Sequence, residues 1–143
     1  MLATDTIRPE TAAIRPEDVV VALLAELHRQ NRVRFGADPV AMHSRFYEWR
    51  EERQYLDLFG SFVFDTRDYF PYSDTLDRVL DGLQLAGYLE RTNPRGTFYM
   101  ITPEVVKLFD KEVKPRFKGP QLKALEELAK QFAESIRTEP AAV

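Results

Sequence analysis

Apolar side chains recur every three or four residues in several stretches of this chain, and that spacing predicts helices. In residues 17–30 one such stripe is formed by Val20, Leu23, Leu24 and Leu27, so we expect an amphipathic helix there. Similar spacing, with Pro or cap residues at the expected starts, predicts helices at 39–53, at 74–86, from Thr102-Pro103-Glu104 onward and at about 120–137.

β-Structure is predicted directly after helix 74–86. Two short runs rich in apolar and β-forming residues, Tyr88–Arg91 and Thr97–Ile101, flank a turn-rich loop at 92–96. This pattern is typical of a β-hairpin. Phe62–Phe64 is a further short apolar run, and we predict a brief strand there.

The two ends of helix 74–86 carry distinct signals. Ser73 is a candidate N-cap, and Asp74 and Asp77 in the first turn interact favourably with the positive end of the helix dipole. Gly87 follows the last turn, where a left-handed residue commonly ends a helix. We therefore interpret Ser73 as a capping residue and not as a nucleophile.

A distinctive set of residues runs from the extended aromatic stretch before this helix to the end of the hairpin. Its members are Phe62-Val63-Phe64, Tyr69-Phe70-Pro71-Tyr72-Ser73, Leu76, Leu80, Leu83, Gly87-Tyr88-Leu89 and Tyr99-Met100-Ile101-Thr102. The arrangement resembles a winged helix-turn-helix domain. It is similar to the YwgA-like and Panacea-like winged-helix proteins, which often show a Tyr-Gly-Pro-Tyr/Phe-Ser turn before a leucine-rich helix; Phe70 stands at the glycine position.

The resemblance implies an α+β fold: a mostly helical winged-helix domain with a β-hairpin wing and additional N- and C-terminal helices. We expect three parts. Residues 1–16, with the pairs Arg8-Pro9 and Arg15-Pro16, are predicted to be a flexible N-terminal arm. Residues 17–118 are the winged-helix-like domain, and residues 119–143 are a C-terminal helix with a short frayed tail that either packs on the domain or dimerises.

Composition narrows the class of protein. The chain has 143 residues, no cysteine and a formal net charge of −3. The length suits one domain with its own core, and the lack of cysteine excludes thiol catalysis and disulfides. No apolar stretch approaches the roughly 20 residues of a membrane span, and the start lacks the pattern of a signal peptide. We therefore expect a cytoplasmic protein with no membrane association.

Candidate catalytic groups are few. The two histidines, His28 and His43, show no metal-ligand spacing, and the chain has no Gly-rich phosphate loop. We interpret both histidines as surface or helix-edge residues. The sequence therefore predicts a non-catalytic binding or regulatory module with no cofactor and no metal.

Duplex DNA is the first partner that the resemblance implies, in a transcriptional-regulator role. In winged helices the helix before the hairpin can enter the major groove while the wing touches phosphate. The charge is unevenly placed, because residues 107–123 carry a net +4 and residues 65–81, which include part of that helix, carry a net −3. The nucleic-acid candidates are Arg78 on the helix, Arg91 and Arg95 in the wing, and Lys107, Lys111 and Lys114 beyond it.

The alternative is a protein-interaction adaptor that uses the same scaffold without DNA. Its candidate partner surface comprises Tyr69, Tyr72, Leu122, Leu125, Phe132 and Ile136. Tyr is favoured at protein interfaces, and the last four residues have a heptad-like spacing that fits a homodimer. Packing inside the chain's own core is the competing interpretation, and the sequence leaves both open.

Overall fold

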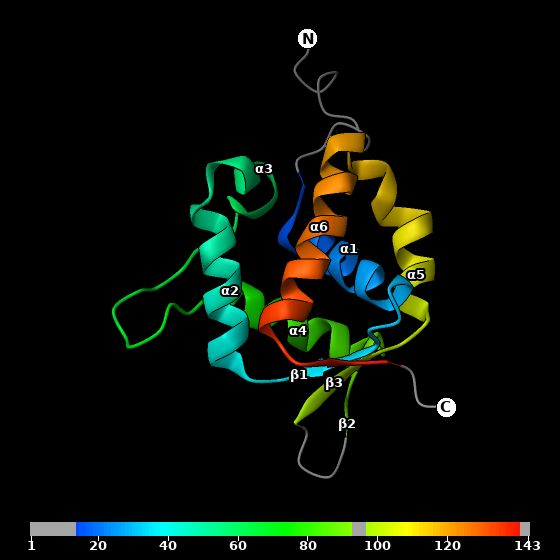
Figure 1. Cartoon of the computed structure of the whole chain (residues 1–143), viewed down its shortest axis with the longest axis horizontal. Helices are drawn as coiled ribbons and strands as arrows, with labels where there is room; N and C mark the ends of the chain where they lie inside the picture. The colour runs from blue at the N-terminus through cyan, green and yellow to red at the C-terminus, as the bar shows by residue number, and fades with distance from the viewer. Residues whose placement is uncertain (1–13, 93–96, 141–143) are drawn as a thin grey trace.

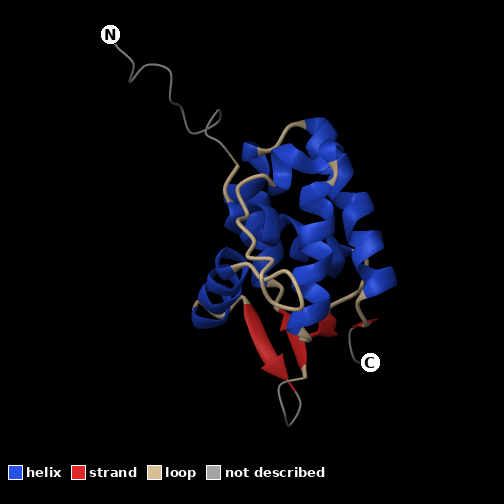
Figure 2. Ribbon diagram, turned by 90° about the vertical axis from the view of Figure 1, so that its left-hand side faces the viewer, coloured by secondary structure: helices blue, strands red, loops and turns tan. Residues whose placement is uncertain are grey.

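The computed structural model describes residues 14–92 and 97–140. Helices form most of it, and the strands gather at one end (Figures 1 and 2). The predicted α+β class, mostly helical with a β-hairpin, is confirmed. In chain order the elements are α1 (Pro16–Arg29), β1 (Arg34–Gly36), α2 (Pro39–Glu51), η3 (Arg53–Tyr55), α3 (Leu56–Phe59), α4 (Asp74–Leu85), β2 (Leu89–Thr92), β3 (Phe98–Ile101), α5 (Glu104–Leu108), η4 (Phe109–Val113), η5 (Lys114–Arg116), α6 (Gly119–Ser135) and β4 (Thr138–Glu139).

The strands form one antiparallel sheet in the order β2-β3-β1-β4. In the predicted hairpin, which is confirmed, Leu89 of β2 pairs with Ile101 of β3; residues 93–96 lie outside the described residues. On the other side of β3, Phe35 of β1 lies opposite Tyr99. Their rings are 5.3 Å apart and both are buried, so this pair joins the sheet to the core beneath the helices.

Helix α1 lies at the centre of the helical layer, in contact with α4, α5 and α6. The predicted helix is confirmed, but a single apolar stripe does not describe it. Every residue from Asp18 to Ala25 is buried, and so is Leu27. A helix that is buried on nearly all sides is typical of a domain core, and α1 is the element around which the other helices pack.

The caps predicted at the starts of α2 and α4 are confirmed, whereas the predicted cap at Thr102 is wrong, because its hydroxyl donates to the carbonyls of Gly87 and Tyr88 and makes no cap at the start of α5. The Asp38 side chain accepts a hydrogen bond from the Val40 N–H at 3.0 Å at the start of α2. Ser73 Oγ accepts from the Leu76 N–H at 3.2 Å at the start of α4. Gly87 has a φ of 85° just beyond that helix, a conformation that favours glycine.

The predicted strand at Phe62–Phe64 is wrong. Phe62 is buried against the ring of Phe46, with centroids 5.6 Å apart, whereas Val63 is exposed. The apolar run reflects a loop that contributes one side chain to an aromatic cluster. The first strand is instead Arg34–Gly36, and three residues are too few to produce a recognisable alternation.

The C-terminal helix packs within its own chain. α6 contacts α1, and its buried side chains include Leu125 and Phe132. After α6, Thr138 pairs with Phe35 of β1, so this part of the tail predicted to fray belongs to the sheet. Residues 141–143 lie outside the described residues.

The last residues of the predicted N-terminal arm, 14–16, belong to the folded body. Ile14 packs against the core and Pro16 is the first residue of α1. Asp18, which is buried, holds this end in place: it accepts a hydrogen bond from the Arg15 N–H at 3.0 Å and from the Arg15 guanidinium. Residues 1–13 lie outside the described residues.

Candidate functional site

A loop projects from the body of the molecule beside α2 and leads into α4 (Figure 1). Asp65 and Tyr72 close it: the Asp65 N–H donates to the Tyr72 carbonyl at 2.7 Å, and the Tyr72 N–H donates back at 3.0 Å. We call residues 65–72 the aromatic loop. Tyr69, in its middle, is 94% exposed, the highest value among the large apolar and aromatic side chains that the structure describes.

The base of the aromatic loop is held by His43 of α2, which is buried. Its Nδ1 accepts a hydrogen bond from the Ser73 N–H at 2.9 Å, so the ring proton resides on Nε2. Nε2 then donates to Asp77 Oδ1 at 3.0 Å. The ring of Tyr72 stacks on the imidazole with centroids 4.8 Å apart. The prediction of a surface or helix-edge position is therefore wrong for His43, because the loop and α4 cover it.

Tyr72 also donates its hydroxyl hydrogen to Asp77 Oδ2 at 2.5 Å. We call the linked residues His43, Tyr72, Ser73 and Asp77 the brace. The hydrogen bond to that carboxylate, together with desolvation and the nearby negative charges, raises the pKa of Tyr72 to about 12. The phenol is therefore a neutral donor throughout the physiological pH range. Asp77 receives hydrogen bonds from two neighbours, and both fix the loop to the first turn of α4.

A Ser, a His and an Asp meet in this brace without forming a nucleophilic triad. Such a triad needs a ring nitrogen that can take the proton of the Ser hydroxyl. In His43 one nitrogen accepts the Ser73 backbone N–H and the other donates to Asp77, while Ser73 Oγ caps α4. The arrangement positions the loop and supports the interpretation of Ser73 as a cap.

The outward side of α4 is acidic with one apolar residue at its end. Asp74, Arg78, Asp81 and Leu85 are separated by four, three and four positions, so they lie on one helix face. Arg78 pairs with Asp74 at 2.9 Å, and Leu85 is 91% exposed. We call these four residues, together with the aromatic loop, the α4–loop face.

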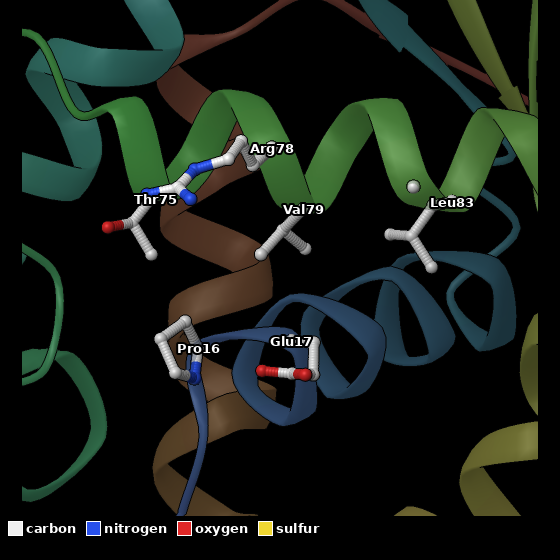
Figure 3. A pocket seen from close by; sticks show the side chains of 7 residues that line it. Pro16, Glu17, Thr75, Arg78, Val79 and Leu83 are labelled. Atoms are coloured by element: carbon white, nitrogen blue, oxygen red, sulfur yellow. The ribbon is translucent and has the colours of Figure 1, made fainter.

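Two pockets adjoin this face. The first, of about 360 Å³, lies between α4 and the start of α1; Figure 3 shows Val79 and Leu83 directed from α4 toward α1, with Pro16 and Glu17 at the start of that helix. The second, of about 630 Å³, lies at the base of the aromatic loop. Thr75 and Arg78 line both pockets, so the two pockets are neighbours along α4. We call the first pocket the groove.

The described members of the predicted nucleic-acid set come from different elements, α4, β2, α5, η4 and η5. Arg91 lies on β2, where its guanidinium is 5.0 Å from the centre of the Tyr99 ring. Lys111 and Lys114 are exposed on η4 and η5, in the chain that leads away from the hairpin after α5 (Figure 1). Arg95 lies outside the described residues. Of the others, Lys107 pairs with Glu104 on α5 at 3.6 Å and Arg78 is on α4.

The predicted partner residues are also divided. Tyr69 is exposed, and Tyr72 is part of the brace below it. The remaining four are Leu122, partly buried against the core, and Leu125, Phe132 and Ile136, which are fully in the core. These three do not lie on the surface of the single chain, so the dimer face that the heptad spacing suggested is used for internal packing.

Sequence reasoning missed two features of the site, Leu85 and Gly82. Leu85 lies about 180° from the buried face of α4, outside the apolar stripe of Leu76, Leu80 and Leu83. A helical-wheel projection of the sequence therefore contains the signal, since it places this leucine on the polar side of the helix. Gly82 lines the groove, but nothing in the sequence separates it from an incidental glycine in a helix.

Within residues 14–92 and 97–140, no group of three or more His, Asp or Glu side chains is placed to hold a metal ion. In the same ranges no helix is both long and apolar enough to cross a membrane. In comparisons with known proteins, no protein-family model, curated protein or solved structure matches the chain.

Proposed function

We propose that this chain is a non-catalytic cytoplasmic interaction module on a winged-helix-type scaffold, and that it binds a protein partner through the α4–loop face. One observation carries the proposal. α4 is the helix before the hairpin, where a winged helix presents its DNA-reading surface, and its outward side exposes Asp74 and Asp81 beside a single arginine. Because Arg78 is already paired with Asp74, this surface repels a phosphate backbone.

The aromatic loop supports a protein partner. Tyr69 is a large amphipathic side chain of the kind that dominates the binding energy of protein interfaces. The backbone bridge between Asp65 and Tyr72 and the stacking on His43 fix the base of the loop before binding. A preorganised base lowers the entropy that must be lost when a partner orders the loop. Leu85 adds a second exposed apolar contact on the same face.

Duplex DNA binding is the second candidate function, and Arg91 on the hairpin is the observation that favours it. A wing arginine is well suited to a phosphate contact. The exposed Lys111 and Lys114 add positive charge, but they lie in the chain that leads away from the hairpin. DNA would therefore have to bind by a surface that excludes the acidic side of α4.

The test compares the full chain with two surface variants and a matched control in extracts of the source cells. We expect a specific protein to be enriched by the parent chain and lost with both Tyr69→Ala and Leu85→Ser. The control is Leu56→Ser, because Leu56 is an exposed leucine on α3. The captured protein is then produced and its affinity for each variant is measured by calorimetry, with a loss of at least tenfold expected for the two site variants.

Two results would overturn the proposal. In the first, the control lowers binding as much as the site variants do. In the second, random-sequence duplex DNA binds at submicromolar concentration in low salt and Arg91→Ala abolishes that binding, which would establish the DNA function instead.

A further inference from the structure

The brace at the base of the aromatic loop requires an uncharged His43. Nδ1 of the ring accepts the Ser73 N–H at 2.9 Å, so this nitrogen carries no hydrogen of its own. A protonated imidazole carries a hydrogen on each nitrogen. Two nitrogens at this distance leave no room for two hydrogens between them, because a single hydrogen already fills the space in a hydrogen bond. Protonation of His43 and its contact with Ser73 therefore exclude each other.

The other hydrogen bond of the ring does not oppose protonation. Nε2 donates to Asp77 Oδ1 at 3.0 Å while the ring is neutral, and it remains a donor when the ring is charged. A hydrogen bond between two charged groups is stronger than one with a neutral donor. His43 therefore keeps its contact with α4 after protonation, and the contact that must open is the one with the backbone at Ser73.

The charges on the elements around the ring do not oppose protonation either. Each arginine of α2, of the aromatic loop and of α4 already pairs with an acid of its own segment: Arg45 with Glu48, Arg50 with Glu51, Arg67 with Asp65, and Arg78 with Asp74. The acids left over in these segments are Asp68 and Asp81, which are exposed, and Asp77, which contacts the ring. Tyr72, which stacks on the ring, is a neutral phenol.

Opening at Ser73 has to move the end of the aromatic loop. Ser73 is fully buried, and a buried N–H without a partner is unfavourable. Its N–H regains a partner only when water reaches it, which requires the chain at Tyr72 and Ser73 to separate from His43. The backbone bridge that closes the loop ends at this same point, because Tyr72 pairs there with Asp65.

Histidine is the side chain that ordinarily changes charge between about pH 5 and pH 8. A proton that binds the open form and not the closed form favours the open form as the pH falls. We infer that the brace is a pH-sensitive switch, in which protonation of His43 below about pH 6 releases the base of the aromatic loop and weakens binding through the α4–loop face. The effect on binding rests on the proposed function, whereas the release of the loop is a property of the chain alone.

The experiment follows the full chain by NMR from about pH 8 to about pH 5. Imidazole ¹⁵N resonances report the protonation of His43 and His28 separately, and the backbone amides of Tyr69 and Ser73 report the loop. We expect both amides to shift with the same midpoint as His43. We also expect hydrogen exchange at Ser73 to rise at least tenfold beyond its intrinsic dependence on pH. His28, partly buried on α1, is the internal control, and its midpoint should not appear in the loop.

His43→Asn keeps an acceptor for the Ser73 N–H and cannot take up a proton. Its loop amides should therefore not respond to pH in this range, whereas the matched control His28→Asn should respond as the parent does. Three results would overturn the inference: His43 stays neutral down to about pH 5, it becomes protonated while the Ser73 amide is unchanged, or His43→Asn responds like the parent. The titration of the parent chain does not depend on the stability of any variant.

The protein captured through the α4–loop face provides the second measurement. Its affinity for the parent chain should fall at least tenfold between about pH 7.5 and about pH 5.5, and its affinity for His43→Asn should stay within about twofold. An equal pH dependence in both chains would contradict regulation by His43. Release of the loop is measured without the partner, so its outcome is separate from that of the proposed function.

Discussion

His43 allows the brace beneath the aromatic loop to be tested one hydrogen bond at a time. In His43→Asn the amide oxygen occupies the place of Nδ1 and still accepts the Ser73 N–H, while the contact with Asp77 is lost. In His43→Gln the longer amide reaches the place of Nε2 and still donates to Asp77, while the Ser73 N–H loses its acceptor. Both variants lose the stack on Tyr72.

The two losses differ in cost because the groups differ in burial. Ser73 is fully buried, and a buried N–H without a partner costs about 1–3 kcal/mol. The Asp77 side chain is 41% exposed, so water replaces the lost hydrogen bond at a cost of about 0.5–1 kcal/mol. The lost stack costs about 0.5–1.5 kcal/mol in either variant. We therefore expect both variants to be destabilised, and His43→Gln to be less stable than His43→Asn by about 1 kcal/mol.

Urea unfolding followed by tryptophan fluorescence measures this difference, since Trp49 is the single tryptophan and is completely buried. The midpoints should shift while the slope stays constant, which identifies a change in stability. The same pair of substitutions at His28, which is only partly buried, should agree with each other to within about 0.5 kcal/mol. A glutamine variant at position 43 as stable as the asparagine variant would refute the reasoning.

Three further predictions follow from the same structure. Gly82→Ala should raise the free energy of unfolding by about 0.5–1 kcal/mol in thermal or urea unfolding, and a decrease would mean that the space around it is not open. Tyr72 should ionise near pH 12, so absorbance at 295 nm should differ between the parent and Tyr72→Phe only above about pH 11, and a difference near pH 10 would contradict the hydrogen bond to Asp77. Because that pKa is raised on folding, its contribution to stability is complete below about pH 10 and is lost as the pH rises toward 12. Asp18→Ala should lower stability by about 2 kcal/mol, because it removes the buried acceptor of the Arg15 N–H and guanidinium at the start of α1, and an effect below about 0.5 kcal/mol would contradict this role.

The helices and the hairpin could be predicted because their signals are local. The cap at Ser73 and the glycine at 87 define α4 from neighbouring residues alone. The strands β1 and β4 could not be predicted, since they contain three and two residues and exist only because β3 and β1 lie beside them. The strand predicted at Phe62–Phe64 was wrong for the converse reason. The apolar run is local, but Phe62 packs in an aromatic cluster assembled from distant segments.

The site was only partly accessible from sequence. Tyr69 was identified as a partner residue from its chemistry, and the structure places it on the surface. The role of His43 depends on Ser73 and Asp77, which are 30 and 34 positions away, so no local pattern contains it. The groove was equally hidden, because its two walls are the start of α1 and the middle of α4.

The proposed preference for a protein partner over duplex DNA rests on the placement of charge more than on its total. A protein that binds duplex DNA through a helix and a wing loses affinity with salt in proportion to the phosphates it contacts, and six to ten contacts are common. Among the described residues of α4 and the hairpin strands, the cations are Arg78 and Arg91, and the first is paired with Asp74. Two arginines would neutralise only about two phosphates, so the affinity for DNA would fall only weakly as salt is raised. Under the proposed function, the same face instead offers a protein partner two exposed contacts, Tyr69 and Leu85, which DNA would not need.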